Sequence, residues 1–86
     1  MPYVTSWERI AMQKGMEQGL QQGLQKGLLE EARGMVLEAL EERFGNVVPD
    51  LAQQIRRMED RGRLRGLLRL AVRAGSLEEF EMHAGL

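Results

Sequence analysis

Few side chains in this 86-residue sequence could carry catalysis or hold a metal ion. His83 is the only histidine and the chain has no cysteine, so thiol catalysis, disulfide bonds and cysteine–zinc sites are excluded. A lone histidine acts as a base only where the fold brings a nucleophile to it. Because His83 lies among small residues, we expect a solvated side chain.

Paired carboxylates can serve as general acids and bases, and adjacent glutamates occur at Glu30-Glu31, Glu41-Glu42 and Glu78-Glu79. Adjacent side chains on a helix diverge by about 100°, which indicates solvent-facing pairs rather than one shared site. The Gly-x-x-x-Gly spacing near the N-terminus matches neither of the glycine-rich phosphate-binding motifs. The sequence therefore predicts a protein that is not an enzyme and that has no catalytic residue, metal ligand or cofactor.

An arginine-rich stretch with no acidic residue has a functional interpretation. It contains Arg61, Arg63, Arg65, Arg69 and Arg73. On a helix, Arg65, Arg69 and Arg73 align at four-residue steps, a pattern that favours contact with phosphates. The possible nucleic-acid contacts are thus Arg61, Arg65, Arg69 and Arg73.

The alternative for these arginines is structural. Their aliphatic stems would cover the edge of the core, and their charges would pair with Glu38, Glu41, Glu42 or Glu59. Two features of the composition favour this alternative. The net charge of -1 does not attract nucleic acid, and the chain has few aromatic residues to stack on bases. We therefore expect any direct DNA binding to be weak.

Four glycines recur at a fixed spacing, and each is followed by an apolar residue. In the ladder KGMEQGLQQGLQKGLL, Gly15, Gly19, Gly23 and Gly27 precede Met16, Leu20, Leu24 and Leu28. Glycine inside a helix costs roughly 1 kcal/mol relative to alanine, so four cost about 3–4 kcal/mol. A sequence that keeps this spacing indicates a surface that another backbone approaches closely. The ladder predicts an oligomer interface formed by Met16, Gly19, Leu20, Gly23, Leu24, Gly27 and Leu28.

The ladder's period predicts how two helices would meet. Apolar residues recur every four residues in the ladder, but about every 3.5 residues from Leu28 onward, as in a left-handed coiled coil or bundle. A four-residue ridge favours right-handed crossings of about -40° to -50°, so ladder helices would cross and diverge, or wrap around each other. In the alternative, the repeats are a low-complexity expansion that forms a frayed or solvated helix. Because glycine weakens an isolated helix, order in the ladder should depend on a partner.

Tyr3 and Trp7 are further candidates for binding. Trp7 lies one turn before Ile10 and Ala11, where it would anchor the chain to a neighbour or, in the alternative, contact a domain upstream. We expect a homo-oligomer, with a dimer favoured over a tetramer.

The ladder belongs to a long predicted helix. Thr5 and Glu8 fit a capping box, and no proline follows until after Gly45. This predicts one helix over residues 6–44, with Gly45 as its left-handed cap. After a short connector, Pro49 or Asp50 starts a second helix. Its apolar face holds Leu51, Ile55 and Met58.

Two more helices are predicted in the C-terminal part. A break at residues 60–62 precedes an amphipathic helix whose apolar stripe is Leu64, Leu67, Leu68, Ala71 and Val72. Gly75 ends that helix, and Ser76 with Glu79 forms a capping box for a last helix. The apolar residues of this last helix are Leu77, Phe80 and Met82.

The predicted fold is all-α: a long N-terminal Gly-x-x-x-Gly helix followed by a small helical bundle, assembled as an oligomer. We divide the chain into a ladder-bearing arm, residues 1–34, and a compact helical domain, residues 35–86. The sequence has no signal-peptide pattern and no apolar run of about 18 residues. We therefore expect a cytoplasmic protein that does not contact a membrane.

Several of these segments resemble one protein family. The run Tyr3–Ile10, the glycine tetrads, and Arg43-Phe44-Gly45 with a following Pro-Asp-Leu resemble the C-terminal region of the Rpn family. These bacterial recombination-promoting nucleases, related to transposases, belong to the PD-(D/E)XK superfamily. The segment 64–80 is similar to the small helical domain that ends many of them. The resemblance implies an upstream nuclease domain that acts on DNA with a divalent metal ion.

The family's nuclease motif does not map onto this chain. That motif has an acidic residue two positions before a lysine, because the carboxylate holds the metal while the lysine helps position the nucleophile and phosphate. The two lysines here are Lys14 and Lys26, and Met12 and Leu24 stand two positions before them. No catalytic residue of the family therefore carries over.

These observations predict a non-catalytic homo-oligomerisation module of an Rpn-like nuclease, which pairs two upstream nuclease domains. One alternative is a small DNA-binding domain that uses the helix Arg61–Arg73. Another is a stand-alone short form that regulates the full-length nuclease through mixed oligomers. The expected partners are a second copy of the chain, the full-length nuclease, and DNA either weakly or through the upstream domain.

Overall fold

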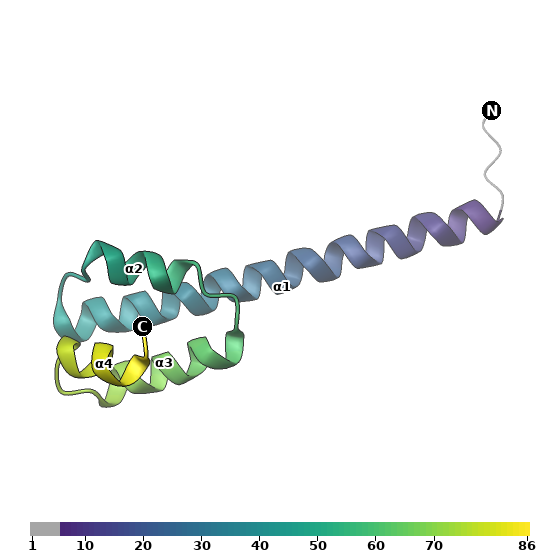
Figure 1. Cartoon of the computed structure of the whole chain (residues 1–86). Helices are drawn as coiled ribbons and strands as arrows, with labels where there is room; N and C mark the ends of the chain where they lie inside the picture. Colours follow the sequence, from purple (N-terminus) through teal and green to yellow (C-terminus); the bar gives the residue numbers. More distant parts are fainter. Residues whose placement is uncertain (1–5) are drawn as a thin grey trace.

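The computed structural model describes residues 6–86, and these residues fold into four helices without a strand. The helices are α1 (Ser6–Phe44), α2 (Pro49–Arg56), α3 (Arg61–Arg73) and α4 (Leu77–Ala84). Figure 1 shows that the C-terminal half of α1 lies within a small bundle with the other helices, while its N-terminal half projects alone. The molecule is elongated, with extents of 65 × 19 × 18 Å. The predicted all-α fold, a long helix followed by a small bundle, is confirmed.

The long helix α1 has the bounds that the sequence predicts. It runs for 39 residues, a length of about 58 Å at 1.5 Å per residue. Gly45 then takes a φ of +84°, and its backbone N–H donates to the Glu41 carbonyl oxygen at 2.9 Å. This left-handed residue ends the helix, because glycine adopts positive φ without a steric penalty. Thr5 of the expected capping box, and Tyr3, lie outside the described residues.

The short helices α2 and α3 begin at recognisable signals. Pro49 is the first residue of α2, where its missing N–H costs no hydrogen bond. The Asp60 carboxylate accepts a hydrogen bond from the Arg63 backbone N–H at 3.2 Å and so caps the start of α3. The break between α2 and α3 covers residues 57–60, so the prediction of a break at 60–62 is wrong for residues 61 and 62, which belong to α3. Met58, expected on the face of the second helix, lies just after its end and is buried.

The last helix, α4, starts at the predicted pair. The Ser76 hydroxyl accepts from the Glu79 backbone N–H at 3.1 Å, and the Glu79 carboxylate accepts from the Gly75 backbone N–H at 2.9 Å. The glutamate therefore reaches one residue further back than in the usual capping box. This geometry fixes the tight connection between α3 and α4.

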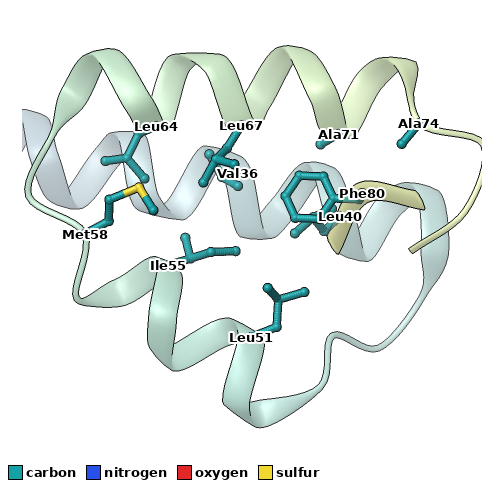
Figure 2. Close-up of a cluster of buried hydrophobic side chains, with 10 residues drawn as sticks. All are labelled: Val36, Leu40, Leu51, Ile55, Met58, Leu64, Leu67, Ala71, Ala74 and Phe80. Carbon is teal, nitrogen blue, oxygen red and sulfur yellow. The ribbon is translucent and has the colours of Figure 1, made fainter. Parts of the chain in front are cut away.

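The hydrophobic core lies among all four helices. Its buried residues are Val36, Leu40, Leu51, Ile55, Met58, Leu64, Leu67, Ala71, Ala74 and Phe80. In Figure 2, α3 and α2 lie on opposite sides of this cluster, and Phe80 from α4 projects towards Leu40. Phe80, Leu40 and Leu64 have no exposed surface, so each contributes its full hydrophobic burial. The core therefore begins well along α1, and the ladder takes no part in it.

Two apolar side chains that were expected to pack inward are exposed. Val72, expected on the stripe of α3, has 62% of its surface exposed, and Met82 of α4 has 78% exposed. The prediction for both residues is wrong. A four-residue step from Leu64 and Leu68 carries Val72 around to the edge of α3, whereas Leu67 and Ala71 face the core.

Candidate self-association surface

An exposed apolar stripe follows the projecting half of α1. It consists of Met12, Met16, Leu20 and Leu24, one residue on each successive turn. Leu20 is 73% exposed and Leu24 is 65% exposed, values far from those of side chains packed in a core. Within residues 6–86, none of them packs against the bundle core. A contiguous apolar surface of this length on a small protein is typical of an interaction site.

The ladder glycines lie beside this stripe and face open space. Apart from the adjoining backbone of α1, a Cβ atom built on Gly15, Gly19, Gly23 or Gly27 would meet no heavy atom of residues 6–86 within 4 Å. Nothing in the fold of these residues therefore requires glycine at the four positions. Each still lowers the stability of the helix by roughly 1 kcal/mol relative to alanine.

The stripe turns slowly around the helix. Each four-residue step advances by about 40° beyond a full turn, so the stripe rotates by roughly 160° between Met12 and Leu28. At its C-terminal end it reaches Leu28, which is half-buried against the bundle. The stripe thus leads from the free end of α1 to the junction between α1 and α3.

A groove of about 250 Å³ lies at that junction. Its lining comes from α1 and α3: Leu28, Glu31, Ala32, Met35, Arg61, Leu64, Arg65 and Leu68. Most of these side chains are apolar, and the three charged ones are exposed. Met35 retains 48% of its surface, although it stands beside the core. Stripe and groove together form one continuous apolar surface, which we call the stripe–groove surface.

The arginines of α3 lie on the outside of the bundle. Arg61, Arg65, Arg69 and Arg73 are all exposed. Within residues 6–86 none of these four side chains makes a hydrogen bond or an ion pair, so the expected pairs with Glu38, Glu41, Glu42 or Glu59 are not formed there. Arg63, between them, donates to the Gly85 carbonyl oxygen at 3.4 Å. Three of these arginines follow one ridge of α3, as the four-residue spacing predicts.

The residues considered for catalysis are dispersed. His83 is exposed in the last turn of α4, and the glutamate pairs are exposed on α1 and α4. Glu79 has a structural role as a cap. In the part of the chain that the structure describes, no three His, Asp or Glu residues are grouped as metal ligands. The helices of residues 6–86 also include none with the length and apolarity needed to span a bilayer.

Sequence reasoning missed Met12, Met35 and the groove. Met12 continues the four-residue spacing one turn before Met16, but alanine rather than glycine precedes it. A search for the Gly-apolar pair therefore starts one turn too late. The groove depends on how α1 packs against α3, which local spacing does not specify.

Comparison with protein-family models, curated proteins and solved structures finds no match in any of the three. The resemblance to the Rpn family is therefore carried only by the sequence segments quoted above, and no comparison supports it. The fold and the exposed surfaces are the remaining basis for a functional argument.

Proposed function

We propose that this chain is a homo-oligomerisation module that associates through the stripe on α1, without catalysing a reaction. The observation that carries the proposal is the exposure of Met16, Leu20 and Leu24 beside glycines where an added Cβ atom would meet no other part of residues 6–86. Burial of apolar surface contributes about 25 cal/mol per Å², and a second α1 helix would provide that burial. It would also use the open backbone beside Gly19 and Gly23, which a lone chain leaves unused.

Two features together favour a second helix over other occupants. The stripe repeats at one residue per turn, which matches the ridge of another helix with the same spacing. The absence of side chains on the ladder glycines lets two helix axes approach within about 8 Å. A second copy of the chain supplies both features at once, and a dimer is the simplest closed assembly.

Sedimentation of matched double variants tests this proposal. Leu20→Gln/Leu24→Gln places polar groups on the stripe, and Val72→Gln/Met82→Gln makes an equally exposed change elsewhere. We expect the stripe variant to sediment as a monomer where the wild type is a dimer, while the control keeps the wild-type mass. Equal masses for the two variants would contradict the proposal.

The resemblance to the Rpn family implies two roles for this self-association. In a protein of that family, paired α1 helices would hold two upstream nuclease domains in one assembly, which suits a reaction on two DNA strands. A separate short product with the same stripe would form mixed oligomers with the longer protein and regulate it. Both roles require the same surface on α1.

DNA binding by α3 is a second candidate. Arg65, Arg69 and Arg73 are exposed on one ridge and have no ion pair within residues 6–86, so they are available to phosphates. The overall charge of -1 provides no long-range attraction to DNA. We therefore expect non-specific binding no tighter than roughly micromolar at physiological salt.

Titration of a fluorescent DNA duplex with the wild type and with Arg65→Glu/Arg69→Glu measures this activity. We expect weak binding that the double variant reduces and that added salt weakens. Arg56→Glu/Arg57→Glu, which makes the same charge change at two exposed positions outside α3, is the control. A nanomolar complex that is lost only in the α3 variant would make DNA binding the main function.

A further inference from the structure

The groove between α1 and α3 is open along its apolar lining, and its occupant can be inferred from the stripe. We propose that it receives the Met12 end of α1 from a second copy, with the two α1 helices antiparallel. This inference rests on the proposed self-association, and it adds the orientation of the helices and a second contact region. It makes the groove part of a reciprocal interface that is used twice in the dimer.

The register follows from the spacing of the stripe. A two-fold axis near Leu20 places Met16 of one copy opposite Leu24 of the other, because the two residues are equally far from Leu20. One step further out, Met12 lies opposite Leu28, which lines the groove. A parallel pair would instead place Met12 beside Met12 and leave the groove without a partner from the stripe.

The direction in which the stripe turns leads the partner helix to the groove. Four-residue ridges pack at right-handed crossings of about -40° to -50°, so the partner's axis shifts sideways as it leaves the axis of symmetry. The stripe shifts in the same sense, by about 40° on each step, and ends at Leu28 on the α3 side. Met35 and Leu68 belong to the same apolar lining as Leu28, which the Met12 end of the partner helix would cover.

Charge complementarity supports the antiparallel orientation. Arg9 and Glu31 are equally far from Leu20, so the antiparallel register places Arg9 of one copy near Glu31 of the other. Both side chains are exposed and neither has an ion pair within residues 6–86. Glu31 is itself part of the groove lining. In a parallel pair each residue would lie beside its own copy, which brings like charges together.

The extent of the interface also favours use of the groove. A stable protein interface takes about 800 Å² and 20–30 residues from each partner. Two crossed helices in contact only near Leu20 would engage a few turns of each chain. Antiparallel docking extends the contact between the two stripes from Met12 to Leu28 on both copies and adds the groove lining at two equivalent places.

Chemical cross-linking tests the orientation directly, because the chain has no cysteine of its own. The variants are Met12→Cys, Leu20→Cys and Leu28→Cys, each treated with a short bismaleimide. We expect Leu20→Cys to form covalent dimers. We expect Met12→Cys and Leu28→Cys to cross-link only after the two proteins are refolded together, with one carrying a tag that identifies the mixed pair.

The outcomes separate this inference from the proposed function. If Leu20→Cys fails to cross-link and the chain sediments as a monomer, self-association and the inference both fail. If Leu20→Cys cross-links while Met12→Cys alone also forms dimers, and the mixture forms no mixed pair, the helices are parallel and only this inference is overturned.

A substitution in the groove tests the second contact region. Met35→Glu places a charge in the groove, and Met82→Glu makes the same change at an exposed position of α4. We expect Met35→Glu to raise the dimer dissociation constant at least tenfold and Met82→Glu to leave it unchanged. Circular dichroism verifies that both variants remain helical. An unchanged dissociation constant in folded Met35→Glu would overturn the role of the groove.

Discussion

Arg43 is the side chain that ties the end of α1 to the end of α3. One terminal nitrogen of its guanidinium donates to the carbonyl oxygens of Ala71, Val72 and Ala74 at 2.7, 2.9 and 2.5 Å. These carbonyls belong to the C-terminal turn of α3, where the helix leaves acceptors without intrahelical donors and where a positive charge is favourable. The guanidinium carbon also lies 4.8 Å from the centre of the Phe44 ring. Arg43 is thus a cap supplied by another helix.

Replacement of Arg43 should lower the stability of the bundle. Arg43→Met keeps most of the aliphatic stem but removes the charge and the donors, so the α3 carbonyls lose their partner. Hydrogen bonds to charged groups contribute about 1.5–3 kcal/mol, and the partial exposure of this site favours the lower half of that range. We expect a loss of about 2 kcal/mol in the free energy of unfolding, measured by urea denaturation.

Arg69→Met is the matched control for that measurement. Arg69 is exposed, lies before the last turn of α3 and has no ion pair within residues 6–86, so its replacement should change stability by less than about 0.5 kcal/mol. Equal losses in the two variants would show that the carbonyl contacts of Arg43 do not stabilise the bundle.

The helices themselves were largely predictable because their signals are local. Pro49, the Ser76–Glu79 pair and Gly45 act on backbone groups within a few residues, so the sequence alone indicates where α1 ends and where α2 and α4 begin. The inward side chains of α1 also follow from spacing, since Val36 and Leu40 continue its apolar pattern into the core.

Contacts between distant elements were not predictable in the same way. Val72 fits the apolar spacing of α3, but which side of that apolar stripe faces the core depends on how α3 packs against the other helices, and Val72 lies at the exposed edge. The partner of Arg43 lies 28 to 31 residues further along the chain, beyond the reach of any local motif. Arg33, which donates to the Met58 carbonyl oxygen at 2.7 Å, links α1 to the α2–α3 connection in the same non-local manner. For the stripe–groove surface, the four-residue spacing of apolar residues predicts the stripe. The groove, in contrast, forms only where α1 packs against α3.

The projecting half of α1 combines helix-weakening glycines with exposed apolar residues. Its glycines reduce helix propensity, and its apolar residues are exposed, so in a lone chain both features are unfavourable. Gly23→Ala should therefore favour the isolated helix by roughly 1 kcal/mol. A larger side chain at the same position adds propensity too, but it occupies the space that a second backbone would use. The sign of its overall effect therefore depends on whether that second backbone is present.

The whole molecule is a long helix with a small helical bundle at one end. Its shape is elongated, with one dimension more than three times the others, and most of the ladder lies outside the bundle, on the projecting part of α1 (Figure 1). Antiparallel association would place the two bundles at opposite ends of a paired rod, and any domain joined to the N-terminus would lie near the partner's bundle. The mass of the assembly therefore measures the proposed self-association most directly.

The most direct test compares the mass of the wild-type chain with that of Gly19→Leu/Gly23→Leu, by sedimentation at matched concentrations. Gly23→Ala serves as the control because its small side chain permits a close approach. We predict that the wild type and Gly23→Ala sediment as oligomers, most simply dimers of the 9.8 kDa chain, and that the double leucine variant falls to a monomer. If the double variant keeps its mass and its melting temperature rises, the ladder glycines are not close contacts, and the proposed self-association through them is wrong.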